Sequence, residues 1–383
     1  MWSYLIYACL AGSTYILIRG WQALESLGRR RVWFTVILLF PVLSFTFTRM
    51  RVVSGVLYDV CFAIGYFWLV AVLYGFMILL SLDILRMIAR IGNIKPRFIY
   101  RNYPRMKVIM FWTIFLILST ILTAGYFNAQ LPRTTHLTIP VEKNAGQLTT
   151  LRIAMASDFH LGQFYGRKSL ARIVNTMNRH NPDMVMLVGD IFDRRPEPVV
   201  LNDLAAEFSR LQPRYGVFYV NGNHDRGGNK GLFPITFFSS LGVQPLLDSL
   251  VLVNNSVYLA GRKDRSSGIR KTIPELLHGI DRQLPVILLD HQPFNLEEAE
   301  QAGVDLQLSG HSHHGQLWPL NHITSAIFEQ DWGLLQKGDT HYYISCGTGT
   351  WGPPVRTAGY AEVVIIDLIF QSSPCPHALH SGF

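Results

Sequence analysis

Four apolar stretches without a single charge lie in the first 131 residues and constrain the fold most. They cover Met1–Ile18, Val32–Thr48, Val60–Leu82 and Val108–Leu131. A helix needs about 20 apolar residues to cross a bilayer, and the first two stretches are near the lower limit. In lipid the backbone must satisfy its own hydrogen bonds, which a helix does within one segment. We therefore expect residues 1–131 to form a transmembrane domain of four helices.

The positive charge of the chain lies beside these stretches. Residues 1–131 contain 13 Lys and Arg but three acids, whereas residues 132–383 contain 21 bases and 23 acids. The net charge of +8 therefore indicates membrane topology, and no nucleic-acid partner is expected. The bases gather in the loop Arg19–Arg31 and in the loop Arg86–Lys107, which the positive-inside rule places in the cytoplasm. We expect a multi-pass protein of the inner (plasma) membrane, with everything after Leu131 on the extracytoplasmic, periplasmic side.

The pattern changes after residue 150. Residues 132–150 are expected to be a linker, because they contain prolines, threonines and a glycine. From 151 to 370 short apolar runs alternate with helical patterns, which predicts an α/β layered domain. Residues 371–383 are expected to be a polar tail. Cys346 and Cys375 either form a disulfide, which an extracytoplasmic location would permit, or stay as free thiols.

Metal-ligand residue types follow the predicted strands of this domain. The clearest case is Met184–Val188, an apolar run that Gly189 stops and Asp190 follows. A short apolar run ended by glycine predicts a buried strand and a tight turn. Five separate predicted strands end in these residue types: Asp158 with His160, Asp190, Asn223 with His224, His291, and His311 with His313. Five equivalent coincidences are hard to explain by packing alone.

These side chains are suited to binding metal ions. Oxygen and nitrogen ligands without a thiolate favour Mn, Fe, Zn or Co. Seven or eight ligands are too many for one ion and suit two. A pair of divalent ions can clamp the attacking and leaving oxygens of a phosphoryl displacement. A hydroxide held between them would be the nucleophile, so that no nucleophilic serine or cysteine is needed.

The order of the motifs supports a family resemblance. The series D-x-H, G-D-x-x-D, G-N-H-[DE], H and G-H-x-H over residues 151–369 resembles the calcineurin-like metallophosphoesterase family. The string Gly310–Gln316 further resembles the membrane-associated bacterial branch of that family, with His314 in place of a glycine. The resemblance implies a central β-sandwich flanked by helices.

The resemblance also implies roles for individual residues. Asp158, His160 and His313 would bind the first metal ion. Asn223, His291 and His311 would bind the second, and Asp190 would bridge both. His224 would contact the phosphate and protonate the leaving oxygen, with Asp225 holding its ring and Asp193 in a supporting position.

Three further features have two interpretations each. His314 is either a solvated loop residue or a substrate contact. Arg356 is either a phosphate-binding residue or part of a structural salt bridge. The apolar residues Leu232, Phe233, Phe237 and Phe238 either form a lipid-facing lip or pack a helix into the core.

The sequence therefore predicts a membrane-anchored, two-metal phosphoesterase. It would cut a phosphomonoester, phosphodiester or pyrophosphate bond, and its place in a membrane favours a lipid or lipid-linked substrate. One alternative is an anchored phosphodiesterase that acts on soluble nucleotides or headgroups. The other is a non-enzymatic membrane module whose metal domain is vestigial.

Overall fold

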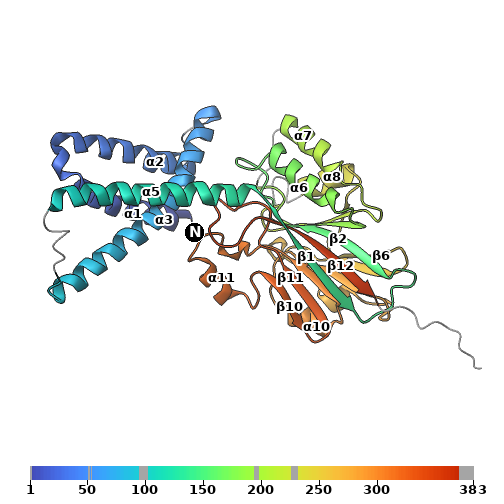
Figure 1. The fold of residues 1–383 in the computed structure, drawn as a ribbon. Coiled ribbons are helices and arrows are strands. Elements are labelled where there is room, and N and C mark those ends of the chain that lie inside the picture. Colours follow the sequence, from blue (N-terminus) through green and yellow to red (C-terminus); the bar gives the residue numbers. More distant parts are fainter. Residues whose placement is uncertain are drawn as a thin grey trace, which may run out of the picture. The chain divides into compact units, whose positions relative to one another are not determined.

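The computed structural model describes residues 2–50, 52, 54–94, 102–193, 198–225 and 232–370. The chain forms two compact units (Figure 1). A helical unit comprises Met1–Phe127 with Gly352–Val355, and an α/β unit comprises Asn128–Trp351 and Arg356–Phe383. The expected tail 371–383, with Cys375, lies outside the described residues, as do Lys95, Arg97 and Arg101 of the basic loop.

Each predicted apolar stretch corresponds to a helix of the helical unit. These are α1 (Trp2–Ala23), α2 (Val32–Met50), α3 (Gly55–Ile91) and α5 (Tyr103–Gln130), with a short 3-10 helix, η1 (Glu25–Arg31), before α2. Within the described residues, three segments are long and apolar enough to cross a membrane: Glu25–Met50, Gly55–Ile91 and Tyr103–Gln130. Helix α1 is not one of these three, so the span expected for Met1–Ile18 stays a prediction.

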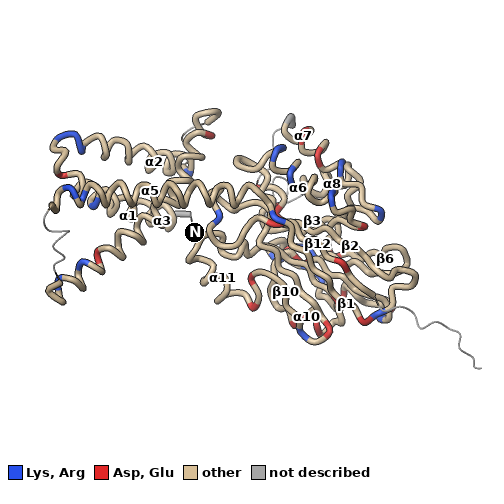
Figure 2. Tube along the Cα trace, in the orientation of Figure 1, with Lys and Arg blue, Asp and Glu red and all other residues tan. Residues whose placement is uncertain are grey.

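The basic loop is shorter than the sequence predicts. Helix α3 continues past Leu82 for nine more residues, because apolar residues such as Ile84 and Ile88 prolong its pattern. Helix α5 starts before the apolar stretch does. Arg86, Arg90, Arg105 and Lys107 therefore lie on helices, and Figure 2 shows bases gathered near helix ends in this unit. Long basic side chains at helix ends can extend their charge towards lipid headgroups.

The α/β unit contains two six-stranded sheets. The first has the order β1-β12-β2-β3-β4-β5 and the second the order β10-β11-β9-β8-β7-β6. The strands of the first sheet are β1 (Arg133–Val141), β2 (Thr150–Ala156), β3 (Met184–Val188), β4 (Val217–Val220), β5 (Gln244–Pro245) and β12 (Glu362–Phe370). Those of the second are β6 (Ser249–Val253), β7 (Val257–Gly261), β8 (Val286–Leu289), β9 (Leu306–Ser309), β10 (Gly333–Lys337) and β11 (Thr340–Ile344).

Parallel pairing aligns the strand ends that matter. In the first sheet β2, β3 and β4 are parallel neighbours, with Ala156 opposite Leu187 and Val188 opposite Val220. In the second sheet β8 and β9 are parallel, with Leu289 opposite Leu308. Carboxyl ends of parallel neighbours lie at one edge of a sheet, where open α/β folds place their sites. The register thus gathers all five predicted ligand loops into two groups.

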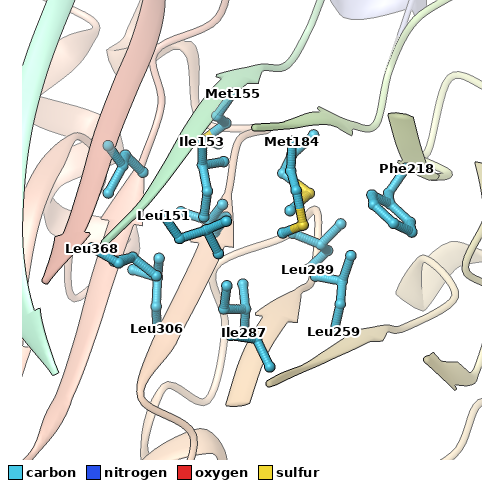
Figure 3. Packing of buried hydrophobic residues seen from close by; sticks show 14 of the residues in the cluster. Leu151, Ile153, Met155, Met184, Phe218, Leu259, Ile287, Leu289, Leu306 and Leu368 are labelled. Carbon is cyan, nitrogen blue, oxygen red and sulfur yellow. The ribbon is translucent and has the colours of Figure 1, made fainter. Parts of the chain in front are cut away.

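The two sheets enclose the main core. Figure 3 shows Ile153 and Met184 of the first sheet and Ile287 and Leu306 of the second among the side chains of one cluster. All four are fully buried. The helices α6 (Arg167–Arg179), α7 (Pro198–Phe208) and α8 (Leu232–Ser240) contribute to a second cluster with β2, β3 and β4. The predicted sandwich flanked by helices is confirmed.

Helix α8 resolves one open alternative. Phe238 is fully buried and packs on Tyr219, with 4.6 Å between ring centres. Phe233 and Phe237 are partly buried against the same cluster. The side chain of Leu232 lies outside the described residues. The described phenylalanines are therefore core residues and form no lipid-facing lip.

The segment expected to be a linker is partly a strand. Residues Arg133–Val141 form β1, which pairs in parallel with β12 along its whole length. Ile139 and Val141 belong to the core between the sheets. The prediction failed because polar threonines and Pro140 suggested a loop, whereas alternation around an edge strand tolerates both.

Replacing Ile139 by alanine tests the contribution of β1. Ile139 is 1% exposed, so Ile139→Ala should lower the free energy of unfolding by about 2–5 kcal/mol. The neighbouring Thr138→Ala is the matched control, because Thr138 is exposed and its loss should cost less than about 0.5 kcal/mol. Urea denaturation of the full chain in detergent, followed by circular dichroism, measures both. Equal effects would mean that residues 133–141 do not pack as a strand.

Candidate metal centre

The predicted ligands occupy the loops after five strands. Asp158 and His160 follow β2, Asp190 follows β3, and Asn223 with His224 follows β4. In the other sheet His291 follows β8, and His311 with His313 follows β9. Several of these residues have a left-handed backbone, with positive φ: Asp158, His160, Asp190, His311 and His313. Side chains disfavour this conformation, and the strain of about 1–3 kcal/mol per residue concentrates at functional sites.

Two glycines allow these loops to approach one another. A Cβ on Gly222 would lie 2.0 Å from Oδ1 of Asp190. A Cβ on Gly310 would lie 2.3 Å from Oδ2 of Asp158. Both distances are far below van der Waals contact, so only glycine fits where the loops of different strands meet.

One cluster of buried ligands consists of Asp158, His160 and His313. Nε2 of His313 lies 3.4 Å from Oδ1 of Asp158 and 3.0 Å from Nε2 of His160. The carboxylate of Asp158 also accepts the backbone N–H of His311 at 3.0 Å. The three side chains thus present one oxygen and two nitrogens to a common point.

A second cluster consists of Asp190, His291 and His311. Nε2 of His291 lies 3.3 Å from Oδ2 of Asp190. The other ring nitrogen, Nδ1, lies 2.9 Å from the carbonyl oxygen of Val188. A hydrogen bond from Nδ1–H to that carbonyl leaves Nε2 as the nitrogen that faces the cluster, which is the usual arrangement for a metal-binding histidine.

Asp190 lies between the two clusters. Its Oδ2 is 3.9 Å from Nε2 of His160 in the first cluster and 3.3 Å from Nε2 of His291 in the second. Its Oδ1 accepts the backbone N–H of His224 at 2.7 Å. Asp190 is 2% exposed. One buried carboxylate therefore contacts both clusters.

Several buried polar atoms here lack a hydrogen-bond partner. They include Oδ1 of Asn223 and Nδ1 of His313. A buried polar atom without a partner costs about 1–3 kcal/mol, and a cation would satisfy the buried amide oxygen of Asn223. The donor set of carboxylate, amide and imidazole is the one that divalent transition metals prefer. The residues thus fit a metal centre.

Asp193 has a larger role than the sequence suggests. Its Oδ1 lies 2.5 Å from Nδ1 of His160 and 3.4 Å from Nδ1 of His224. One carboxylate therefore orients a predicted metal ligand and the predicted leaving-group acid. The side chain of His224 is 27% exposed, so its Nε2 is left for a substrate. The motif G-D-x-x-D contained Asp193, but spacing along the chain could not show which rings it would reach.

Asp225 does not hold the ring of His224, contrary to the prediction. Its carboxylate accepts the backbone N–H groups of Ile191, Phe192 and Gly222, at 2.9, 3.0 and 2.9 Å. Asp225 joins the loop after β4 to the loop after β3. The reason is that three backbone donors occupy the carboxylate of Asp225, which is 2% exposed.

The charges of the centre shift its pKa values in opposite directions. Burial by itself lowers the pKa of His160, but the carboxylates of Asp193, Asp190 and Asp158 outweigh burial and raise this pKa to about 9. Burial and the neighbouring His291 lower the pKa of His311 to about 4. His160 therefore carries a proton that a metal ion would have to displace, whereas His311 is already neutral.

Arg356 supports the loop that carries His313. Its side chain is fully buried. It donates to the carbonyl oxygens of His313 and Gly349, at 3.2 and 2.6 Å. These contacts with backbone carbonyls match neither a phosphate site nor a salt bridge. They favour a structural role, in which Arg356 fixes the loop that carries His313.

His314 is anchored by an acid that the sequence analysis did not single out. Its Nδ1 lies 2.9 Å from Oδ2 of Asp331, and its ring lies 5.0 Å from that of Trp332. The backbone carbonyl of Asp331 accepts a hydrogen bond from Ser312. His314 is therefore a partly buried, bonded residue and not a solvated one. Asp331 had no sequence signal, because it lies 17 residues from its partner.

Comparison with known proteins shows which family the sequence resembles. Residues 151–315 match the family model of the calcineurin-like phosphoesterases. The chain is 34% identical over 272 residues to a transmembrane protein with a metallophosphoesterase domain from Danio rerio, with 66% of this chain and 61% of that protein covered. The corresponding protein of Bos taurus is 32% identical over 279 residues, with 68% and 62% covered.

A shorter relative fits almost entirely within the chain. An uncharacterized metallophosphoesterase of Aquifex aeolicus is 35% identical over 229 residues, with 57% of this chain and 85% of that protein covered. The two vertebrate proteins are matched over about three fifths of their length. The motifs, the two ligand clusters and these similarities agree, and the chain belongs to the calcineurin-like metallophosphoesterase family.

Proposed function

We propose that the α/β unit is a two-metal phosphoesterase. The observation that carries the proposal is the position of Asp190, whose single buried carboxylate contacts both ligand clusters. Asp158, His160 and His313 would hold one divalent ion, Asn223, His291 and His311 would hold the other, and Asp190 would serve both. Two such ions would supply Lewis-acid charge to the phosphate oxygens and acidify a water molecule. Mn, Fe, Zn and Co all suit these ligands.

The protein's own side chains orient the substrate and move a proton. His224 faces the phosphate with Nε2, because Nδ1 lies against Asp193. The protonated imidazole donates its proton to the leaving oxygen, and the carboxylate of Asp193 stabilises the charged ring. The buried carboxylates of Asp158 and Asp190 would attract the cations.

The substrate is proposed to be a lipid or lipid-linked phosphate ester. Support comes from the three helices able to span a membrane and from relatives named as transmembrane proteins. The distribution of bases along the helical unit favours an extracytoplasmic location for the α/β unit in the inner membrane. An anchored enzyme for soluble nucleotides is the second candidate. A vestigial module is disfavoured, because unpartnered buried ligand atoms such as Oδ1 of Asn223 are costly unless a cation occupies the site.

Replacing Asp190 tests the shared ligand. Asp190→Asn keeps the size of the side chain but removes the charge that two ions would share, so turnover of a chromogenic phosphodiester with Mn should fall more than about a hundredfold. Asp339→Asn is the control, because Asp339 is an exposed loop acid. Activity in detergent and metal content by mass spectrometry are measured together. Unchanged turnover in Asp190→Asn would refute the two-metal proposal.

Replacing His224 tests the leaving-group acid. His224→Gln should slow an alkyl phosphoester about 10²–10⁴-fold, because an alkoxide needs the proton. A nitrophenyl ester leaves without a proton, so its loss should be much smaller. The comparison of kcat for the two esters separates proton donation from damage to the site. Equal losses for both esters would count against His224 as the acid.

Proton release tests the coupling between metal and His160. The pKa of about 9 means that His160 is charged below pH 9 in the metal-free protein, whereas a metal needs the neutral ring. Binding of Mn at pH 7.5 should release at least one proton. For each proton released, the affinity for Mn should fall about tenfold for every unit by which the pH is lowered. Calorimetric titration with Mn in buffers of different ionisation enthalpy measures this number. Asp193→Asn should reduce proton release, and no release in the unmodified protein would contradict the expectation.

A further inference from the structure

An uncharged, apolar surface follows the last metal-ligand motif. Residues 315–328 contain no Asp, Glu, Lys or Arg, and they include helix α11 (Asn321–Ile327). Four large apolar side chains are exposed here: Trp318 (49%), Leu320 (37%), Ile323 (56%) and Ile327 (61%). The spacing of three and four residues places the last three on one side of the helix. We call these four residues the α11 surface.

The α11 surface is attached to the metal-ligand loop. Oδ2 of Asp331 accepts hydrogen bonds from Thr324 and Ser325 of α11, at 2.7 and 3.1 Å, and also contacts Nδ1 of His314. A Cβ on Gly315 would lie 2.4 Å from the backbone nitrogen of Asn321. The helix therefore packs directly on the loop between His313 and α11. Whatever the α11 surface touches is held beside the metal centre.

A loop rich in basic residues adjoins the end of α11. Residues 262–271 contain five bases and one acid. Arg262 and Arg270 pair with Asp290, and Lys263 pairs with Asp248. Arg265, Lys271 and Ile269 are exposed, and Ile269 at the tip is 98% exposed. The guanidinium of Arg265 lies 4.6 Å from the ring centre of Phe294. That ring lies 4.8 Å from the ring of Phe328, which directly follows Ile327. The basic loop and the end of α11 are thus joined through two aromatic rings.

The same basic loop contacts Asn221, which lies near a proposed metal ligand. Nδ2 of Asn221 donates to Oγ of Ser267 at 3.1 Å, and the backbone N–H of Asp264 donates to Oδ1 of Asn221. Asn221 lies two residues before Asn223. The ring of Phe328 lies 6.0 Å from that of His311. Both parts of the surface therefore adjoin residues that we assign to the second metal ion.

We propose that the α11 surface and the basic loop dock on an anionic lipid bilayer and present a headgroup phosphate to the metal centre. Exposed tryptophan and isoleucine beside bases are the chemistry of an interfacial membrane contact, and the exposed Arg265 and Lys271 match anionic headgroups. The chain also confines this unit to a membrane, because the candidate span α5 ends at Gln130 and β1 begins at Arg133. The substrate part of the proposal rests on the proposed phosphoesterase function, whereas the docking does not.

A fluorescent label tests the docking directly. Ile323→Cys is labelled with an environment-sensitive dye in the full chain, in nanodiscs of phosphatidylethanolamine and phosphatidylglycerol. Leu252→Cys is the matched control, because Leu252 is similarly apolar and 38% exposed on β6. Cys375→Ser serves as the background, and the other three cysteines are buried. Lipids with a nitroxide on the acyl chain should remove about half of the signal at position 323, because an interfacial helix reaches the headgroup–acyl boundary, and leave position 252 unchanged.

Two results would overturn the docking. Equal insensitivity of both labels to nitroxide lipids would place the α11 surface in water. A label at position 323 that is shielded from water but not quenched by these lipids would mean that protein covers the surface, either a second copy or another part of the chain. Because the measurement needs no turnover, it is repeated in Asp190→Asn. Quenching there together with inactivity of the unmodified protein would retain the docking and reject the phosphoesterase proposal.

A kinetic comparison tests the consequence for substrate. The double variant Ile323→Ser with Ile327→Ser should lower kcat/KM for a phosphoester lipid in vesicles about tenfold, whereas kcat/KM for a soluble chromogenic ester should not change. A tenfold loss is what a tenfold weaker affinity for the lipid surface would give. Leu252→Ser should leave both kcat/KM values unchanged. A parallel loss on both esters, or no loss on either, would contradict a role of the surface in lipid access.

Discussion

The buried carboxylate of Asp190 is the interaction on which the rest of the centre depends. It contacts His160 from one cluster and His291 from the other sheet. A charge that is 2% exposed is tolerated only where other groups compensate it. The surrounding loops provide this compensation with a backbone N–H from His224 and with imidazoles, and metal ions would complete it. Position 222 requires glycine, because a Cβ there would overlap the side chain of Asp190.

Three further acids position the residues around Asp190. Asp193 orients both His160 and His224, Asp225 joins two loops through backbone hydrogen bonds, and Asp331 connects His314 to α11. Each of these acids comes from a loop, and each fixes an element distant from it in the chain. The metal centre is therefore a product of both sheets, and its geometry depends on the core that holds the sheets together (Figure 3).

The two units follow different physical rules. The helical unit is organised by the need to satisfy backbone hydrogen bonds inside a bilayer, so its apolar residues are exposed over much of its surface. The α/β unit buries its apolar residues between and beside two sheets. The α11 surface departs from that second rule, since an uncharged run with four exposed apolar side chains is unusual next to a charged site. The proposed lipid contact would account for this departure.

The sequence by itself determined the features that rest on local patterns. Apolar stretches predicted the helices, and short apolar runs predicted the strands that precede Asp158, Asp190, Asn223, His291 and His311. Family motifs then identified the ligand types. Tertiary structure decided what depends on distant contacts: that residues 133–141 form a strand, that Asp193 rather than Asp225 reaches His224, and that Arg356 binds backbone carbonyls. The reason is that hydrophobic period and turn residues act over a few positions, whereas the partner of a carboxylate or guanidinium is set by how two sheets and their loops meet.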